Sequence, residues 1–98
     1  MINEVKQLFL TTGEVKQAYT IKGIVHATVK KTLTAEQLDE VDNFDELYRQ
    51  VQDILIERAV AKDGDGIIGV SFEPQIVRVS VGPKYLMLHG YGTVISLN

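Results

Sequence analysis

Two histidines, His26 and His89, are the side chains best suited to metal chemistry, because the chain contains no cysteine. A neutral imidazole is a good ligand for zinc, copper or nickel. Each histidine lies in a stretch that reads as a β-strand, so the two rings would approach each other if those strands paired. We therefore take both as candidate ligands of a divalent metal ion. The alternative is that they are ordinary structural or surface histidines, as isolated imidazoles on separate strands usually are.

The rest of the chain offers no catalytic residue set. Nucleophilic catalysis needs a nucleophile, a base and an orienting group, and no serine or threonine here sits in a nucleophile-elbow context. The segment Asp63-Gly64-Asp65-Gly66 is acidic, but the spacing and the final glutamate of an EF-hand loop are absent. We interpret it as a turn. The glycines form no phosphate-binding pattern either.

Aromatic residues gather near the end of the chain. Tyr85, Met87, His89 and Tyr91 occupy alternate positions and would share one face of a strand. Such a face could line a pocket or an interface between subunits. We favour the interface, because aromatic residues and methionine are enriched at interface cores.

Composition excludes several classes of protein. A chain of 98 residues is expected to form a single domain, residues 1–98, and its net charge of −3 with a pI near 5.3 argues against a nucleic-acid binder. No segment approaches the ~20 apolar residues of a membrane span. The first residues do not form a signal peptide, so we expect a cytoplasmic protein. A small chain without cysteine often gains stability by self-association, so we expect a homo-oligomer.

Alternating and β-branched patterns predict four strands. Pro74 interrupts the third of them, and because proline cannot donate to a sheet ladder it marks an edge, a bulge or a break. Gly90 and Gly92 would allow the last strand to bend or bulge. The predicted strands cover residues 6–11, 17–29, 66–81 and 85–97.

A long helix is predicted before the third strand. Asn43 and Glu46 form a capping box, and an earlier one, Thr34 with Gln37, predicts one or two helical turns in the acidic segment 36–46. Gly64 is expected to end the long helix as its left-handed residue, about 20 residues after it starts. One face of this helix recurs at three- and four-residue steps: Phe44, Leu47, Tyr48, Val51, Ile54, Leu55, Arg58 and Ala59.

The predicted order is strand, strand, helix, strand, strand. This order favours an α+β fold in which one long helix packs on one face of a mainly antiparallel sheet. The other face of the sheet and its edges would then need cover. Another subunit is the simplest cover.

Three stretches resemble the YbjQ-like family of small bacterial and archaeal proteins, which is catalogued under heavy-metal binding. The opening stretch has Thr11-Thr12, then Tyr19, then Gly23-Ile24-Val25. The segment from Ala59 to Val70 is similar to the family's helix end, glycine turn and apolar strand. Gly92-Thr93-Val94 is similar to its closing strand.

The resemblance implies a two-layer fold assembled into a ring, commonly a pentamer, and implies no catalytic residues. The chain departs from the family pattern at two places. Gly64-Asp65-Gly66 stands where the family usually has Gly-Ala-Asn, and the acidic stretch 33–42 lacks a Gly-Gly-Arg element that family members often carry before the long helix.

Three functions remain open on the sequence. The first is a non-enzymatic oligomer that binds a metal ion or small ligand between subunits. The second is a small-molecule enzyme with an inter-subunit site that uses His26 or His89 as acid and base, since imidazole titrates near neutrality. The third is a protein–protein assembly module that recruits a partner through the acidic segment 36–46.

Overall fold

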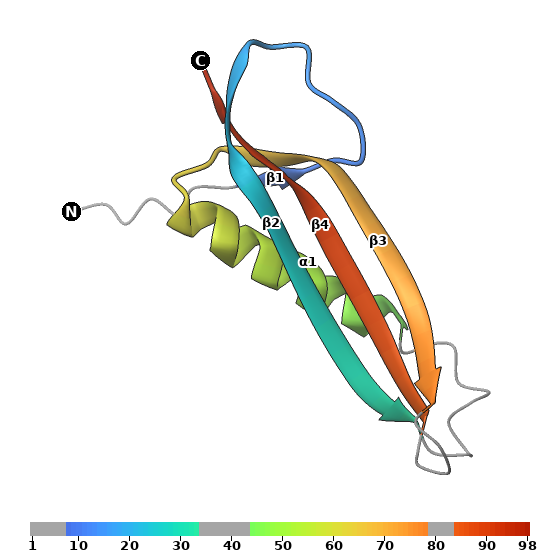
Figure 1. The fold of residues 1–98 in the computed structure, drawn as a ribbon. Coiled ribbons are helices and arrows are strands. Elements are labelled where there is room, and N and C mark those ends of the chain that lie inside the picture. Colours follow the sequence, from blue (N-terminus) through green and yellow to red (C-terminus); the bar gives the residue numbers. More distant parts are fainter. Residues whose placement is uncertain (1–7, 34–43, 79–83) are drawn as a thin grey trace.

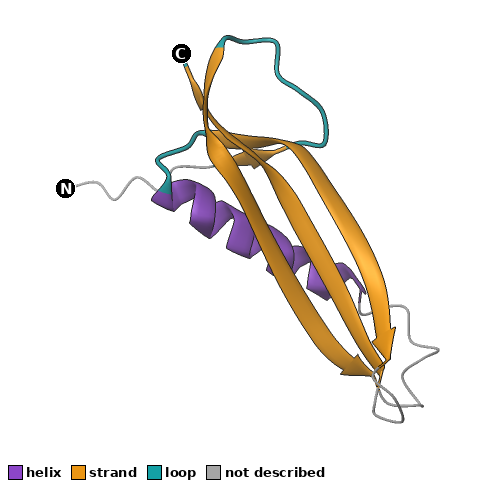
Figure 2. Cartoon of the chain, in the orientation of Figure 1, coloured by secondary structure: helices purple, strands orange, loops and turns teal. Residues whose placement is uncertain are grey.

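The computed structural model describes residues 8–33, 44–78 and 84–98 and gives the predicted order of elements (Figure 1). The α+β class predicted from the sequence is confirmed (Figure 2). The first two strands differ from their predicted bounds. Within the described residues the first covers only Phe9–Leu10, and the second starts two residues later and ends four residues later than predicted. The elements are β1 (Phe9–Leu10), β2 (Tyr19–Leu33), α1 (Phe44–Ala61), β3 (Gly66–Arg78) and β4 (Lys84–Leu97).

Some predictions fall on residues outside the described ranges. These are the start of the first strand, the earlier capping box, Asn43 of the second box, the end of the third strand, and nearly all of the acidic segment. Among the described residues, the helix is not apolar enough over its length to cross a membrane.

The sheet is mixed, with strand order β1-β3-β4-β2. The long strand β4 lies in the middle and pairs antiparallel with both β2 and β3, while β1 pairs parallel with β3 through Phe9 opposite Gly66. The N-terminal strand therefore lies beside β3, and β2 forms the far edge of the sheet. The helix crosses one face of this sheet, behind β2 and β4 in Figure 1.

The hydrophobic core lies between α1 and that face. Val51, Leu55 and Ala59 from the helix are completely buried, as are Leu88 and Val94 from β4. Burying a side chain the size of leucine stabilises the fold by about 1.5–3 kcal/mol. The helix face predicted from the sequence is thus the face that packs on the sheet.

The helix ends differently from the prediction. The residue with left-handed backbone is Asp63, at φ 58°, and Gly64 does not have a positive φ. The amide of Gly64 donates to the Ala59 carbonyl at 3.0 Å, and the amide of Asp63 donates to the Val60 carbonyl at 2.9 Å. These two bonds form a Schellman motif with Asp63 at the position usually taken by glycine. Gly64 serves close packing instead, since a Cβ there would lie 2.3 Å from Val94 Cγ1.

Two bulges set the register of the long strands. In β3, Gly69 and Val70 together oppose one residue of β4, and Gly69 has φ 60°, as in a glycine-type bulge. In β2, the extra residue is Lys22, next to Gly23 at φ 133°. The bulge in β3 therefore lies before Pro74 and opposite Gly92, and β4 itself carries no extra residue.

Gly90 and Gly92 have a packing role. A Cβ on Gly90 would lie 2.4 Å from Val51 Cγ1, and one on Gly92 would lie 2.5 Å from Ile67 Cγ2. Their missing side chains let the helix and the bulged strand approach the middle of the sheet.

Candidate ligand site on the open sheet face

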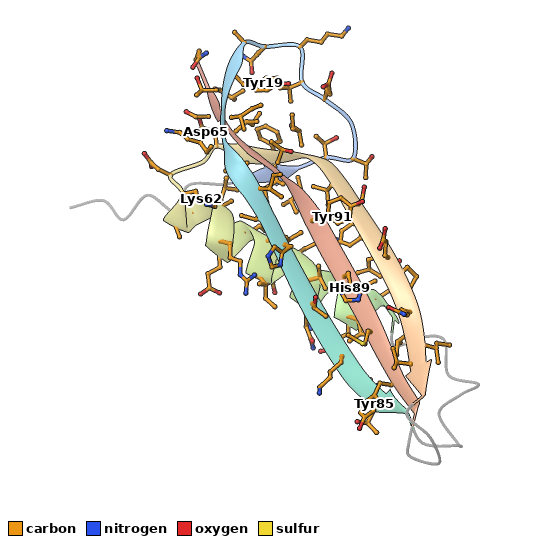
Figure 3. All side chains as sticks on the ribbon, in the orientation of Figure 1. Tyr19, Lys62, Asp65, Tyr85, His89 and Tyr91 are labelled. Carbon is orange, nitrogen blue, oxygen red and sulfur yellow. The ribbon has the colours of Figure 1, made fainter. Side chains whose placement is uncertain are left out.

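The face of the sheet opposite α1 carries the residues that the sequence singled out. Along β2 and β4, alternate residues such as Ala27 and Leu88 are buried beneath the helix. Their neighbours therefore face the other way. We call this side the open face. It carries His26 and Thr28 from β2 and the predicted set Tyr85, Met87, His89 and Tyr91 from β4. Figure 3 labels Tyr85, His89 and Tyr91 along β4.

The strands that carry the two histidines do pair, but the rings are not directly opposite each other. His26 is paired with Tyr91, and His89 is paired with Thr28. The histidines are thus diagonal neighbours on the same face, and such positions are about 7–8 Å apart. Bulges such as the one at Lys22 fix this register, and the sequence alone did not predict it.

The ring of His89 is oriented by a neighbour. Its Nδ1 atom lies 2.8 Å from Thr28 Oγ1, a hydrogen bond whose donor depends on the tautomer of the ring. On its other side, His89 is paired with Glu73 of β3. Nδ1 is therefore occupied within the subunit, and Nε2 is the nitrogen left for an external ligand.

One subunit does not assemble a metal site by itself within the described residues. There, no group of three or more histidine, aspartate or glutamate side chains converges. A structural zinc site needs four ligands. Among the described residues, His26 and His89 therefore lack the further ligands that such a site needs.

The tyrosines lie on both sides of the sheet, Tyr48 on the side of the helix and Tyr91 on the open face, as their positions predict. Tyr48 of α1 packs edge-on against Phe72 of β3, with ring centroids 5.0 Å apart. Tyr91 is 42% exposed on the open face. Lys30 Nζ lies 5.5 Å from the centre of the Tyr85 ring, a cation–π contact.

The acidic turn is structural. One carboxylate oxygen of Asp65 accepts a hydrogen bond from the Leu97 amide at 2.7 Å. The Asp65 amide donates to the Ile95 carbonyl at 2.7 Å. Both bonds tie the turn to the end of β4, in agreement with its interpretation as a turn and against a calcium loop.

A groove at the edge of the sheet was not predicted. It has a volume of about 360 Å³ and lies between β2 and the end of α1. Arg58 was expected on the buried helix face, yet it is exposed at the margin of that face and Nη1 donates a hydrogen bond to the His26 carbonyl. The only signal in the sequence is a charged residue within an apolar stripe. The lining residues are Ile24, Val25, His26, Arg58, Ala61 and Lys62.

No family model and no curated protein matches this sequence. A solved structure does match, with a TM-score of 0.86 and 40% sequence identity. It is the crystal structure of a protein with unknown function from Pediococcus pentosaceus ATCC 25745, described as belonging to the DUF74 family. The similarity covers 93% of this chain and 98% of that one. At this identity and coverage, the chain belongs to the DUF74 family.

Proposed function

We propose that this protein is a non-enzymatic homo-oligomer of the YbjQ type, whose subunits together hold a divalent metal ion or a small ligand. The observation that carries the proposal is the open sheet face. The helix covers only one side of the sheet, and on the other side Tyr91 remains 42% exposed and Ile24 70% exposed. Apolar side chains grouped on an uncovered face favour contact with another molecule.

A second copy of the chain is the occupant we propose. Closed rotational symmetry is the usual arrangement of soluble oligomers. The resemblance to YbjQ-like proteins favours a ring of five. In such a ring, the open face of each subunit would be covered by its neighbour.

The ligand site of the proposal uses His89 and His26. Thr28 holds the ring of His89 in one orientation, as a metal-binding histidine is commonly held through its second nitrogen. Glu73 lies beside His89 in the next strand. These groups fall short of a full ligand set, so the missing ligands would come from the neighbouring copy.

The test measures metal binding and assembly together. Zn²⁺, Ni²⁺ and Cu²⁺ are titrated calorimetrically into the purified, metal-stripped protein, and the same titrations are made with His89→Ala and His26→Ala. Gln75→Ala is the matched control, because Gln75 is exposed on the same face. We expect the histidine variants to lose binding and the control to keep it. Equal binding by all four proteins would rule out this metal site.

A further inference from the structure

The hydrogen bond from Arg58 shows which backbone groups of β2 point away from the sheet. Arg58 reaches the His26 carbonyl from outside the sheet, so this carbonyl points away from β4. In a paired antiparallel strand, the two backbone groups of one residue point the same way and successive residues alternate. His26, Thr28 and Lys30 therefore direct their amides and carbonyls outward. Because β2 is the last strand of the sheet in the described part of the chain, these groups form an open edge, on which the His26 carbonyl accepts the bond from Arg58.

The opposite edge of the sheet is blocked. The same alternation applies across β4. The backbone groups of Glu73, which is paired with His89, point toward β4, so the backbone nitrogen of the next residue, Pro74, points away from the sheet. Proline has no amide hydrogen to offer a further strand. The outer side of β3 is thus interrupted near its middle, and β2 is the edge that can accept a partner strand.

Positive charge follows the free edge of β2. The strand carries Lys22, Lys30 and Lys31 and no acidic residue, although the chain as a whole has a net charge of −3. Arg58 and Lys62 add two cations from the helix side. None of these five side chains forms an ion pair with another described residue.

The space beside the edge suits an extended chain. The groove that contains Arg58 and Lys62 has no carboxylate in its lining and has exposed Ile24 at its margin. A second groove, of about 180 Å³, lies further along the same boundary between β2 and α1, beside Lys30 and Lys31. Its one acidic residue, Glu46, is already paired with Arg49 at 3.1 Å.

We propose that this boundary, residues 24–30 of β2 with Arg58 and Lys62, binds an extended acidic peptide segment of another protein by β-strand addition. The outward groups of His26, Thr28 and Lys30 would supply main-chain hydrogen bonds, which give such complexes their affinity. Carboxylates on the helix side would meet Arg58 and Lys62, and apolar side chains would pack on Ile24. Arg58 would exchange the His26 carbonyl for a carboxylate, a stronger partner for guanidinium.

A second copy of this chain is a poorer occupant of the same edge. Two β2 edges would bring together two rows of lysines, and like charges placed opposite each other destabilise strand pairs. Pairing of β2 with the outer side of β3 would meet Pro74. These features disfavour pairing between two copies of the chain, but they do not disfavour binding of an acidic segment. The proposed oligomer contact uses side chains of the open face, whereas this site uses the outward backbone groups of β2, and Ile24 lies where the two surfaces meet.

The test uses a blocked nine-residue peptide of alternating glutamate and valine, titrated up to 1 mM into ¹⁵N-labelled protein and followed by amide NMR shifts. We expect shifts at the His26, Thr28 and Lys30 amides. Arg58→Gln combined with Lys62→Gln should weaken binding about 10-fold or more, because charge-assisted hydrogen bonds are lost. Lys16→Gln, in an exposed loop, is the matched control and should bind as the wild type does.

Two further peptides separate strand addition from simple charge attraction. In one peptide the odd-numbered amides are N-methylated, and in the other the even-numbered amides. One of the two should lose binding and the other should bind nearly as before, because only alternate amides of an added strand face β2. A lysine–valine peptide should not bind. The proposal would be overturned by no shifts at 1 mM, by equal binding of the two N-methylated peptides, by binding of the lysine peptide, or by unchanged binding by the double variant. Dissociation of an oligomer by the acidic peptide would assign the edge to a second copy instead, which also overturns it.

Discussion

Thr28 Oγ1 and His89 Nδ1 lie 2.8 Å apart across the paired strands β2 and β4. The contact fixes the plane of the imidazole on the open face and occupies one of its two nitrogens. A histidine restrained in this way meets a ligand with less conformational entropy to lose than a free one. The threonine is therefore a positioning residue in the proposed site.

Replacing that threonine tests its positioning role. We expect Thr28→Val to weaken Zn²⁺ or Ni²⁺ binding by about 10-fold, the lower end of the range for loss of a ligand's hydrogen-bond partner. Calorimetric titration measures the change, and native mass spectrometry checks that assembly is retained. Thr32→Val, on an exposed residue of the same strand and face, is the control. Unchanged metal affinity in Thr28→Val would show that the hydrogen bond does not serve a ligand site.

The approach of the helix to the sheet depends on Gly90. A Cβ on this residue would lie 2.4 Å from Val51 Cγ1, on a short side chain that cannot move aside without repacking. We expect Gly90→Ala to lower the free energy of unfolding by about 1–3 kcal/mol, as overpacking of a core does. Urea unfolding measures it. Gly13→Ala, where the nearest atom would be 3.8 Å away, should stay close to wild type, and equal stability of the two variants would contradict the packing argument.

The helix end offers a stabilising substitution. Asp63 holds a left-handed backbone conformation that glycine adopts without steric penalty. We expect Asp63→Gly to raise the free energy of unfolding by about 0.5–1 kcal/mol and Asp63→Val to lower it. Thermal unfolding of the three proteins checks the order. If the valine variant were at least as stable as the wild type, the Schellman assignment would be wrong.

The open face can be tested against another exposed apolar position. If the proposed oligomer forms through this face, we expect Tyr91→Lys to leave only the monomer, because a charge would be buried between subunits. Val60→Lys is the control, since Val60 is 55% exposed but lies on the helix. Light scattering after gel filtration gives both masses, with circular dichroism to confirm folding. Assembly that survives Tyr91→Lys, or that is lost equally in Val60→Lys, would place the contact elsewhere.

The sequence predicted the helix and the strands better than it predicted which strands lie side by side. The helix face around Val51 and Leu55 and the alternation from Tyr85 to Tyr91 follow directly from the periods of helix and strand. The position of β1 beside β3 rests on the pairing of Phe9 and Leu10 and on backbone hydrogen bonds between Thr11 and β3, and no local sequence pattern predicts it.

Errors arose where a residue's role depends on a distant partner. Gly64 has the residue type of a helix stop, but it is required by Val94, thirty positions later, and the left-handed conformation falls on Asp63. The diagonal placement of His26 and His89 depends on the register of β2 and β4, which the bulge at Lys22 shifts. The edge role of Arg58 becomes visible only once β2 is known to be the outer strand.

Assembly through the open face is the central claim, and native mass spectrometry of the purified, metal-free protein tests it most directly. We predict one closed oligomer, with a pentamer at five times the subunit mass of 10.9 kDa as the expected species. Addition of metal should then increase the mass of that oligomer without changing its subunit number. A species at 10.9 kDa alone, at micromolar concentration and physiological salt, would contradict the account.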